Sequence, residues 1–161
     1  MDKLPPAIDV CCSIRAFWFD KKDSRALFLD RREGRQEVNR PGRRDMVVAP
    51  DIIADFTKLP FESNSFWHVV FDPPHLKNSG TGNIGFHYGR LSASWQDDMR
   101  GGFKECFRIL KPNGTLIFKW NETDYPLSQI LKLTEQKPLY GHKSGKLNKT
   151  HWVAFIKGSS E

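Results

Sequence analysis

The sequence predicts an α/β fold with a mostly parallel central sheet of about six to seven strands and helices on both faces. Six short apolar runs are separated by turn residues and longer polar stretches, at residues 7–12, 26–29, 51–54, 68–71, 115–120 and 152–156. Apolar runs without polar alternation are typical of strands that are buried on both faces of a parallel sheet. An amphipathic segment between the fourth and fifth runs supports the same fold class.

That segment predicts a helix over residues 97–110, where apolar side chains recur at spacings of three and four from Met99 to Leu110. Acidic residues at its start complement the helix dipole. The sequence Lys-Pro-Asn-Gly at 111–114 ends the helix, because proline cannot continue it and glycine permits a turn. A short helix over residues 127–134 and a strand with a Gly- and Lys-rich hairpin over residues 140–149 complete the predicted elements.

The length and the cysteine content indicate the number of domains and argue against a metal site or a disulfide framework. A chain of 161 residues fits one domain, residues 1–161, and we expect no second domain. Three cysteines, two of them adjacent and without His or Cys partners at ligand spacing, suit neither a metal site nor a disulfide framework. We expect Cys11 and Cys12 to be small packing residues, no bound metal, no secretory signal, no membrane span and a cytoplasmic location.

The positive charge is concentrated in two places. The formal net charge is +6, and residues 31–44 hold six arginines against two glutamates. A second group near the C-terminus consists of Lys137, His142, Lys143, Lys146 and Lys149. Basic surface attracts polyanions because neutralised phosphates release their counterions. Nucleic acid is the expected partner, through Arg40, Arg43 and Arg44, and a solvated charged loop is the alternative.

Two long stretches without periodicity, residues 31–50 and 77–95, follow strand ends. Loops of this length in a compact domain are usually functional, and ligands bind beyond the strand ends of open α/β sheets. The second stretch is glycine-rich and carries Phe86, His87, Tyr88 and Arg90, which offer stacking and phosphate contacts. We expect it to bind substrate and to order when a base enters. An ordinary flexible surface loop is the alternative.

The strongest chemical signal follows the fourth apolar run, where the chain continues Asp72-Pro73-Pro74-His75. Prolines fix the backbone and remove two amide donors, so the Asp72 carboxylate and the Pro73 carbonyl remain as rigid acceptors. Two adjacent acceptors can hold one exocyclic NH2 group and let its nitrogen rehybridise as it attacks a methyl sulfonium. His75 would stack on the base.

This tetrapeptide resembles the Asp-Pro-Pro-Tyr motif of class I S-adenosylmethionine-dependent amino-methyltransferases that act on adenine N6 or cytosine N4. Histidine replaces the usual tyrosine, phenylalanine or tryptophan. The acid that ends the second run and the stretches 51–61, 62–72 and 107–116 are also similar to that family. The resemblance covers nearly the whole chain and is nearest to small phage and bacterial DNA adenine methyltransferases. It implies a Rossmann-like fold and S-adenosylmethionine as cofactor, with S-adenosylhomocysteine as product.

The resemblance also implies which residues contact the cofactor: Asp9, Cys11, Cys12, Phe17, Asp30, Asp55, Phe56 and Asp72. Asp30 would receive a ribose hydroxyl, and Asp55 and Phe56 lie in the stretch that contacts the cofactor adenine. The first turn departs from the family's acid-x-Gly-x-Gly, because residues 9–20 contain no glycine. Small Cys11, Cys12 and Ser13 can still admit the methionine part.

Several functions remain open at this point. DNA adenine N6 is the first choice, while adenine, cytosine N4 or guanine N2 in RNA presents an NH2 group to the same acceptors. The missing glycines motivate a catalytically silent nucleic-acid-binding module as an alternative. Methylation of a small molecule is a third possibility. We expect no separate target-recognition domain. Specificity would therefore come from the two long loops or from a partner subunit that supplies target recognition, or it would be low.

Overall fold

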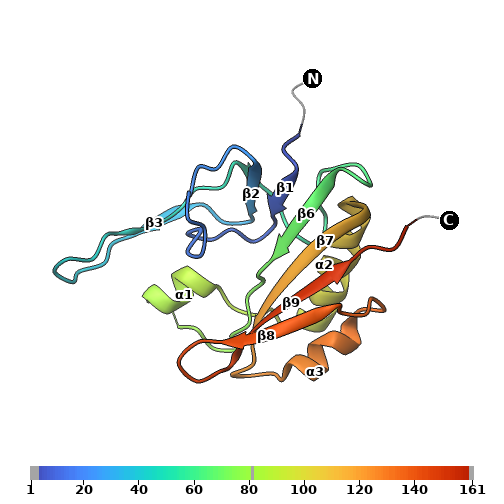
Figure 1. Cartoon of the computed structure of the whole chain (residues 1–161). Coiled ribbons are helices and arrows are strands. Elements are labelled where there is room, and N and C mark those ends of the chain that lie inside the picture. The colour runs from blue at the N-terminus through green and yellow to red at the C-terminus, as the bar shows by residue number, and fades with distance from the viewer. Residues whose placement is uncertain (1–3, 81, 160–161) are drawn as a thin grey trace.

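The computed structural model describes residues 4–80 and 82–159 and contains a seven-stranded sheet in the order β5-β2-β1-β6-β7-β9-β8 (Figure 1). Five strands are parallel: β1 (Ala7–Asp9), β2 (Ala26–Asp30), β5 (Ile52–Ile53), β6 (Phe66–Phe71) and β7 (Leu110–Asn121). The last two, β9 (Thr150–Ile156) and β8 (Tyr140–Ser144), add antiparallel pairs at one edge. The predicted α/β class, the mostly parallel sheet and the six predicted strands are confirmed.

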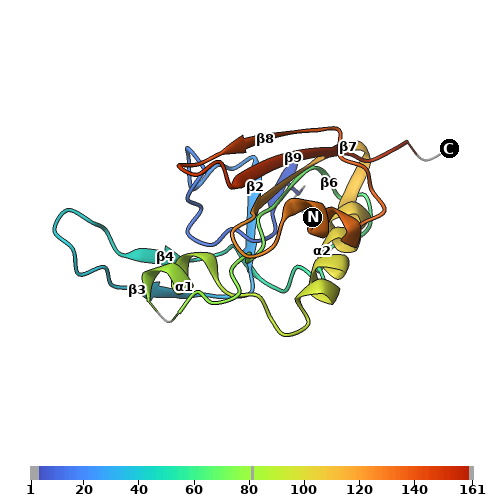
Figure 2. The same cartoon turned by 90° about the horizontal axis from the view of Figure 1, so that it is seen from below.

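Helix α2 (Trp95–Ile109) covers one face of the sheet and was predicted to within two residues at each end. It buries Met99, Phe103 and Cys106 almost completely, and Phe103 packs edge-on against Phe71 at 5.4 Å between ring centroids. The short helix predicted at residues 127–134 is α3 (Leu127–Ile130) followed by the 3-10 turn η1 (Leu131–Leu133). Figure 2 shows α2 and α3 on the same side of the sheet.

The opposite face is covered by irregular chain at β1 and β2. Residues 10–25 form consecutive turns, so this connection does not supply the helix that was expected on this face of the sheet. Trp18 packs on Phe28 of β2, with 4.8 Å between ring centroids. Along β7, Phe118 and Trp120 are fully buried under α2, whereas Ile117 and Lys119 on the opposite face are only half-buried. No helix therefore covers the side chains on that face of β7.

Both long non-periodic stretches contain secondary structure. Residues 31–50 form an antiparallel hairpin, β3 (Gly34–Gln36) with β4 (Met46–Val48), which projects away from the sheet (Figures 1 and 2). Residues 77–95 include the short helix α1 (Asn83–Tyr88), while Thr81 lies outside the described residues. None of the helices in the described ranges is both long and apolar enough to cross a membrane.

Candidate functional site

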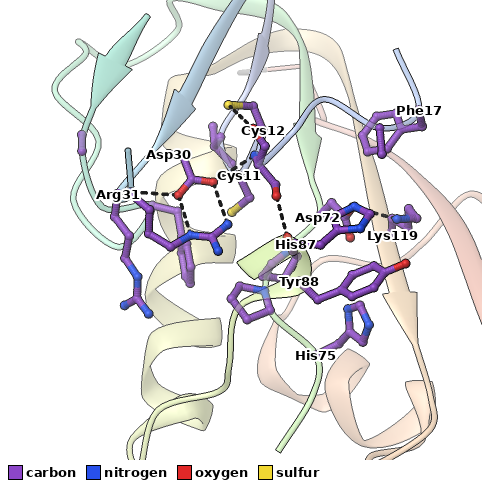
Figure 3. A pocket seen from close by; sticks show the side chains of 18 residues that line it. Cys11, Cys12, Phe17, Asp30, Arg31, Asp72, His75, His87, Tyr88 and Lys119 are labelled. Carbon is purple, nitrogen blue, oxygen red and sulfur yellow. Dashed lines mark hydrogen bonds and ion pairs between the residues drawn. The ribbon is translucent and has the colours of Figure 1, made fainter. Parts of the chain in front are cut away.

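A cleft lies at the carboxyl ends of β1, β2 and β6 (Figure 3). From β1 the sheet continues through β2 and β5 on one side and through β6 and β7 on the other, so the strand order reverses at β1. Open α/β sheets bind ligands at such a point. The cleft brings together six of the predicted cofactor residues, the whole tetrapeptide and two residues of α1: Cys11, Cys12, Phe17, Asp30, Phe56, Asp72, Pro73, Pro74, His75, His87 and Tyr88. Separate parts of the sequence thus line one cavity.

The turn that follows β1 has backbone conformations typical of glycine, although it contains no glycine. Ser13 and Arg15 both have left-handed backbones, with φ of 45° and 54°. Such conformations cost free energy in non-glycine residues and persist where surrounding contacts hold them. Here the Ser13 amide donates to Asp30 Oδ2 at 2.9 Å, and the Arg15 guanidinium lies 3.8 Å from the centroid of the Phe28 ring. Tertiary contacts therefore replace the glycines expected from the family's turn.

Asp30, at the end of β2, is almost buried and already has a cation beside it. Its Oδ1 accepts from Arg32 Nε at 3.1 Å and from the Arg32 amide at 2.9 Å. Arg32 continues to α1, where Nη1 donates to the Phe86 carbonyl at 2.8 Å. Ser13 Oγ donates to the neighbouring His87 carbonyl at 2.5 Å. Two side chains of the predicted cofactor region therefore fasten α1 over the cleft.

This fastening leaves little room. The cleft has a free volume of ≈ 50 Å³, whereas sites for small molecules usually measure about 300–1,000 Å³. His87 and Tyr88, stacked with 4.1 Å between ring centroids, fill part of the space. The side chains suit S-adenosylmethionine, with an acid for the ribose, Phe56 for an adenine and small residues at the turn. α1 would have to move aside before a complete cofactor could bind.

At the other end of the cleft, Asp72 forms an ion pair that the sequence analysis missed. Lys119 Nζ of β7 donates to Asp72 Oδ2 at 2.7 Å, and the two side chains are 18% and 16% exposed. The ammonium also lies 5.2 Å from the ring centroid of Phe17 and 5.5 Å from that of Trp152. Among the described residues, Asp72 Oδ1 has no hydrogen-bond donor. A lysine in the middle of a buried apolar strand was the signal available in the sequence.

His75 does not offer its ring face for stacking. It is 6% exposed, and its ring packs edge-on against Tyr88 and Trp120. Burial lowers its pKa, which favours the neutral imidazole, and Nδ1 is buried without a partner among the described residues. Tyr88 is the exposed aromatic here, at 38%. It borders both the first cleft and a wider one of ≈ 310 Å³ beyond Asp72, which Lys119 and Thr150 also line.

Two predicted cofactor residues lie outside the cleft lining. Asp9 is completely buried and accepts from Trp18 Nε1 at 2.8 Å and from the Cys11 amide at 3.1 Å. Its burial raises its pKa to about 7. Asp55 accepts from the Thr57 amide at 2.8 Å and pairs with Arg31 at 3.9 Å. Asp9 therefore stabilises the turn after β1 through its bonds to Cys11 and Trp18, and Asp55 stabilises the turn that leads to Thr57.

The cysteines pack as expected. Cys12 is 2% exposed, and Cys11 lies against the core while bordering the cleft. Burial raises the pKa of the Cys12 thiol to about 12, so it is protonated at neutral pH. No group of three or more His, Cys, Asp or Glu side chains in the described ranges is arranged to hold a metal ion.

The predicted substrate residues fall into two groups. His87 and Tyr88 line the cleft, Arg90 borders an adjoining cavity with Pro74 and Phe56, and Phe86 contributes the carbonyl that binds Arg32. Arg40, Arg43 and Arg44 are exposed on the β3–β4 hairpin and are not part of the cleft lining. The structure thus joins the glycine-rich stretch to the cleft. Of the arginine-rich stretch, Arg31 and Arg32 border the cleft, whereas Arg40, Arg43 and Arg44 lie away from it.

Comparison with known protein families finds no match for this chain, and comparison with curated proteins finds none either. Solved structures do resemble it. A Pyrococcus horikoshii protein has a TM-score of 0.63 at 15% identity, over 98% of this chain and 84% of that one. A SAM-dependent methyltransferase from Methanosarcina mazei has a TM-score of 0.57 at 11% identity, over 99% and 95%.

The Burkholderia thailandensis 1,6-didemethyltoxoflavin-N1-methyltransferase, solved with S-adenosylhomocysteine, has a TM-score of 0.55 at 10% identity, over 95% of this chain and 71% of that one. At such low identities the likeness concerns the fold alone. The chain has the Rossmann-like fold of class I SAM-dependent methyltransferases.

Proposed function

We propose that the protein transfers a methyl group from S-adenosylmethionine to an exocyclic amino group of a nucleic-acid base, with adenine N6 in DNA as the first candidate. The observation that carries the proposal is the arrangement of Asp30 and Asp72 in one cleft. Asp30 ends the strand at which a cofactor ribose binds in this kind of fold. Asp72 keeps one carboxylate oxygen open to an incoming donor.

Lys119 gives the acceptor group a fixed orientation. Because Lys119 Nζ holds Oδ2 of Asp72, Oδ1 is the oxygen left to accept an N–H of the amine. The Pro73 carbonyl is the second acceptor in the tetrapeptide, and the two prolines hold the backbone rigid. An amine held by both hydrogens directs its nitrogen lone pair toward the cofactor side of the cleft, which saves the entropy of alignment.

The cofactor supplies a methyl group on a positively charged sulfur. The amine nitrogen bonds to the methyl carbon as the carbon–sulfur bond breaks, and the bonding electron pair stays on the sulfur of the thioether product. The nitrogen then loses one proton to water, which restores a neutral amine. Tyr88, which is 38% exposed, would contact the base, and its ring is held by stacking on His87 and by edge-on packing against the neutral His75.

One observation favours a second function. The Asp30 carboxylate is occupied by Arg32 and Ser13, and α1 fills part of the cleft. A catalytically silent nucleic-acid-binding module would keep this closed arrangement permanently. The two functions differ in a single property, which is whether the protein binds S-adenosylmethionine.

Isothermal titration with S-adenosylmethionine tests this property directly, with Asp30→Ala as the control for the site. We expect micromolar binding that the control loses. Transfer of labelled methyl groups to DNA and RNA, with Asp72→Ala as the matched variant, then tests the chemistry. Asp72→Ala should lose transfer by about 10²-fold or more while it still binds the cofactor. A folded protein that fails to bind cofactor, with nucleic acid present or absent, would establish the silent module instead.

A further inference from the structure

The β3–β4 hairpin presents arginines at a defined tip. Its ladder pairs Gly34 with Val48 and Gln36 with Met46, and the chain then continues to a turn formed by residues 40–43. The amide of Arg43 donates to the carbonyl of Arg40 at 3.1 Å, and Gly42 between them has φ of 76°. Proline at the second position and a left-handed glycine at the third are typical of a type II turn. The turn therefore fixes the spacing of Arg40 and Arg43.

The charge at this tip is available for binding. Arg35, near the ladder, pairs with Asp45 at 2.6 Å, and the other Asp45 oxygen accepts from the Val38 amide at 3.1 Å. In contrast, Arg40, Arg43 and Arg44 are exposed and form no ion pair within the described residues. Asp45 thus neutralises the arginine at the base of the hairpin and stiffens it, while three cations remain at the end.

The base of the hairpin adjoins the wall of the cleft. A side chain at Gly34 would begin 3.7 Å from the Phe86 ring of α1, and Figures 1 and 2 both show α1 beside the hairpin. The next two residues of α1, His87 and Tyr88, line the cleft. A polymer bound along the hairpin would therefore pass the cleft entrance, where one of its bases can enter.

We propose that this hairpin is a target-recognition arm for duplex DNA; the inference rests on the proposed function, because a base of the bound duplex must reach Asp72. Paired strands lie about 4.8 Å apart, and the major groove of B-DNA, about 12 Å wide and about 8.5 Å deep, admits a two-stranded ribbon. The chain from Gly34 to the tip spans at most roughly 20 Å at about 3.3 Å per extended residue, which would let the tip reach the floor of the groove. The deep, narrow major groove of duplex RNA excludes such a ribbon.

Arginine at the tip serves both contacts that duplex binding needs. A guanidinium can neutralise a phosphate, and it can also donate two hydrogen bonds to O6 and N7 of guanine in the major groove. Lysine carries the same charge without this planar pair of donors. Replacing arginines with lysines therefore separates recognition of sequence from attraction to phosphate.

Binding of a short labelled duplex over a range of salt concentrations tests the arm. The variant Arg40→Gln/Arg43→Gln/Arg44→Gln should bind at least tenfold more weakly, and its slope of log K against log salt should become less negative by roughly 2.7, since each phosphate that an arginine neutralises adds about 0.9 to the slope. The matched control, Lys143→Gln/Lys146→Gln/Lys149→Gln, removes three charges from the β8–β9 hairpin and should change both quantities much less.

The charge-conserving variant Arg40→Lys/Arg43→Lys/Arg44→Lys should keep most of the salt slope but lose preference among duplexes of different sequence. Equal competition by duplex RNA or single-stranded DNA, or an unchanged affinity of the glutamine variant, would overturn the proposed arm.

Methyl transfer to a short single-stranded oligonucleotide separates the two proposals, since it needs the cleft but not the groove contact. If the arm alone is wrong, all three variants transfer to duplex DNA as the wild type does. If the methyltransferase function is wrong, none of the proteins methylates any nucleic acid, whereas the difference in duplex binding persists.

Discussion

Asp30 and Asp72 stand at the carboxyl ends of two strands of the same sheet, β2 and β6, and each carboxylate binds a cation. In Asp30 both oxygens are used, Oδ1 by the backbone amide and side chain of Arg32 and Oδ2 by the Ser13 amide. In Asp72 only Oδ2 is used, by Lys119, among the residues that the structure describes. At the end of the cleft where we propose that the cofactor binds, Asp30 therefore has no free oxygen, whereas at the proposed acceptor end Asp72 keeps one.

The two cations also differ in what else they hold. Arg32 extends to the Phe86 carbonyl, so its bond to Asp30 is part of the fastening of α1. Lys119 lies near the Phe17 and Trp152 rings, and its ammonium is not part of that fastening. Under the proposed function, cofactor entry would require Arg32 to rearrange, while binding of an amine at Asp72 would require no displacement of Lys119.

Lys119→Met gives the largest expected loss of kcat, because it removes the ion pair that orients Asp72. Without the ammonium, the Asp72 carboxylate can rotate away from the amine, and misplacement of this kind can cost about 10²-fold in kcat. KM for S-adenosylmethionine should change little, since the cofactor end is intact. Initial rates at varied cofactor concentration measure both constants.

Lys119→Arg is the matched control, because it keeps a cation within reach of Asp72 and should retain more of the rate. Lys119→Met also leaves a mostly buried carboxylate unpaired, at a cost of about 2 kcal/mol in unfolding free energy. A folded Lys119→Met protein with normal kcat would remove Lys119 from its positioning role.

Arg32→Gln opens the cofactor end and should produce the second largest effect. It removes the charge-assisted hydrogen bonds to Asp30 and Phe86, each worth about 1.5–3 kcal/mol when intact. We expect S-adenosylmethionine to bind about tenfold more tightly, because Asp30 becomes available and α1 moves aside more readily. Titration calorimetry gives the affinity, and faster proteolytic cleavage within residues 83–88 would report the release of α1.

Arg31→Gln provides the control for Arg32, since Arg31 also borders the cleft but pairs with Asp55 at 3.9 Å rather than with Asp30. Its effect on cofactor affinity should be small. Weaker cofactor binding in Arg32→Gln than in Arg31→Gln would mean that Arg32 holds the cofactor rather than blocking it.

The Asp72 end and the Asp30 end of the cleft also differ in how much of their structure the sequence predicts. The Asp72 tetrapeptide is local, so its pattern of acid and prolines was visible along the chain. Its pairing with Lys119 depends on the register that places Phe71 beside Phe118, and a sequence does not display strand register. The lysine within the apolar run 115–120 was visible in the sequence, but its partner was not.

The Asp30 end depends on contacts that are still more distant. Ser13 bonds to His87, 74 residues away, and this contact holds α1 in a stretch that lacks helical periodicity in the sequence. Likewise, the β3–β4 hairpin is largely exposed, so it shows no alternation of apolar and polar residues that would predict strands. Buried strands and α2 were predicted because burial imposes a pattern, and these solvent-facing elements carry none.

Asp9, at the end of β1, extends the comparison to an acid that no cation contacts among the described residues. Desolvation by burial raises its pKa from 3.8 to about 7, against the opposing hydrogen bonds from Trp18 and Cys11. Between these two values the folded state binds more protons than the unfolded state. The free energy of unfolding therefore falls as the pH rises from about 4 to about 7, and the penalty is complete above the folded pKa.

Asp9→Asn isolates this contribution, because the amide oxygen can still accept from Trp18 while the side chain never becomes charged. Asp23, Asp45, Glu105 and Glu122, whose pKa values are lowered by hydrogen bonds, change stability in the opposite sense but equally in both proteins. Urea unfolding of both proteins from pH 4 to pH 8 should show the variant gaining stability over the wild type as the pH rises. Parallel pH profiles would mean that Asp9 is ionised in the folded protein throughout, and that the hydrogen bonds from Trp18 and Cys11 compensate for its burial.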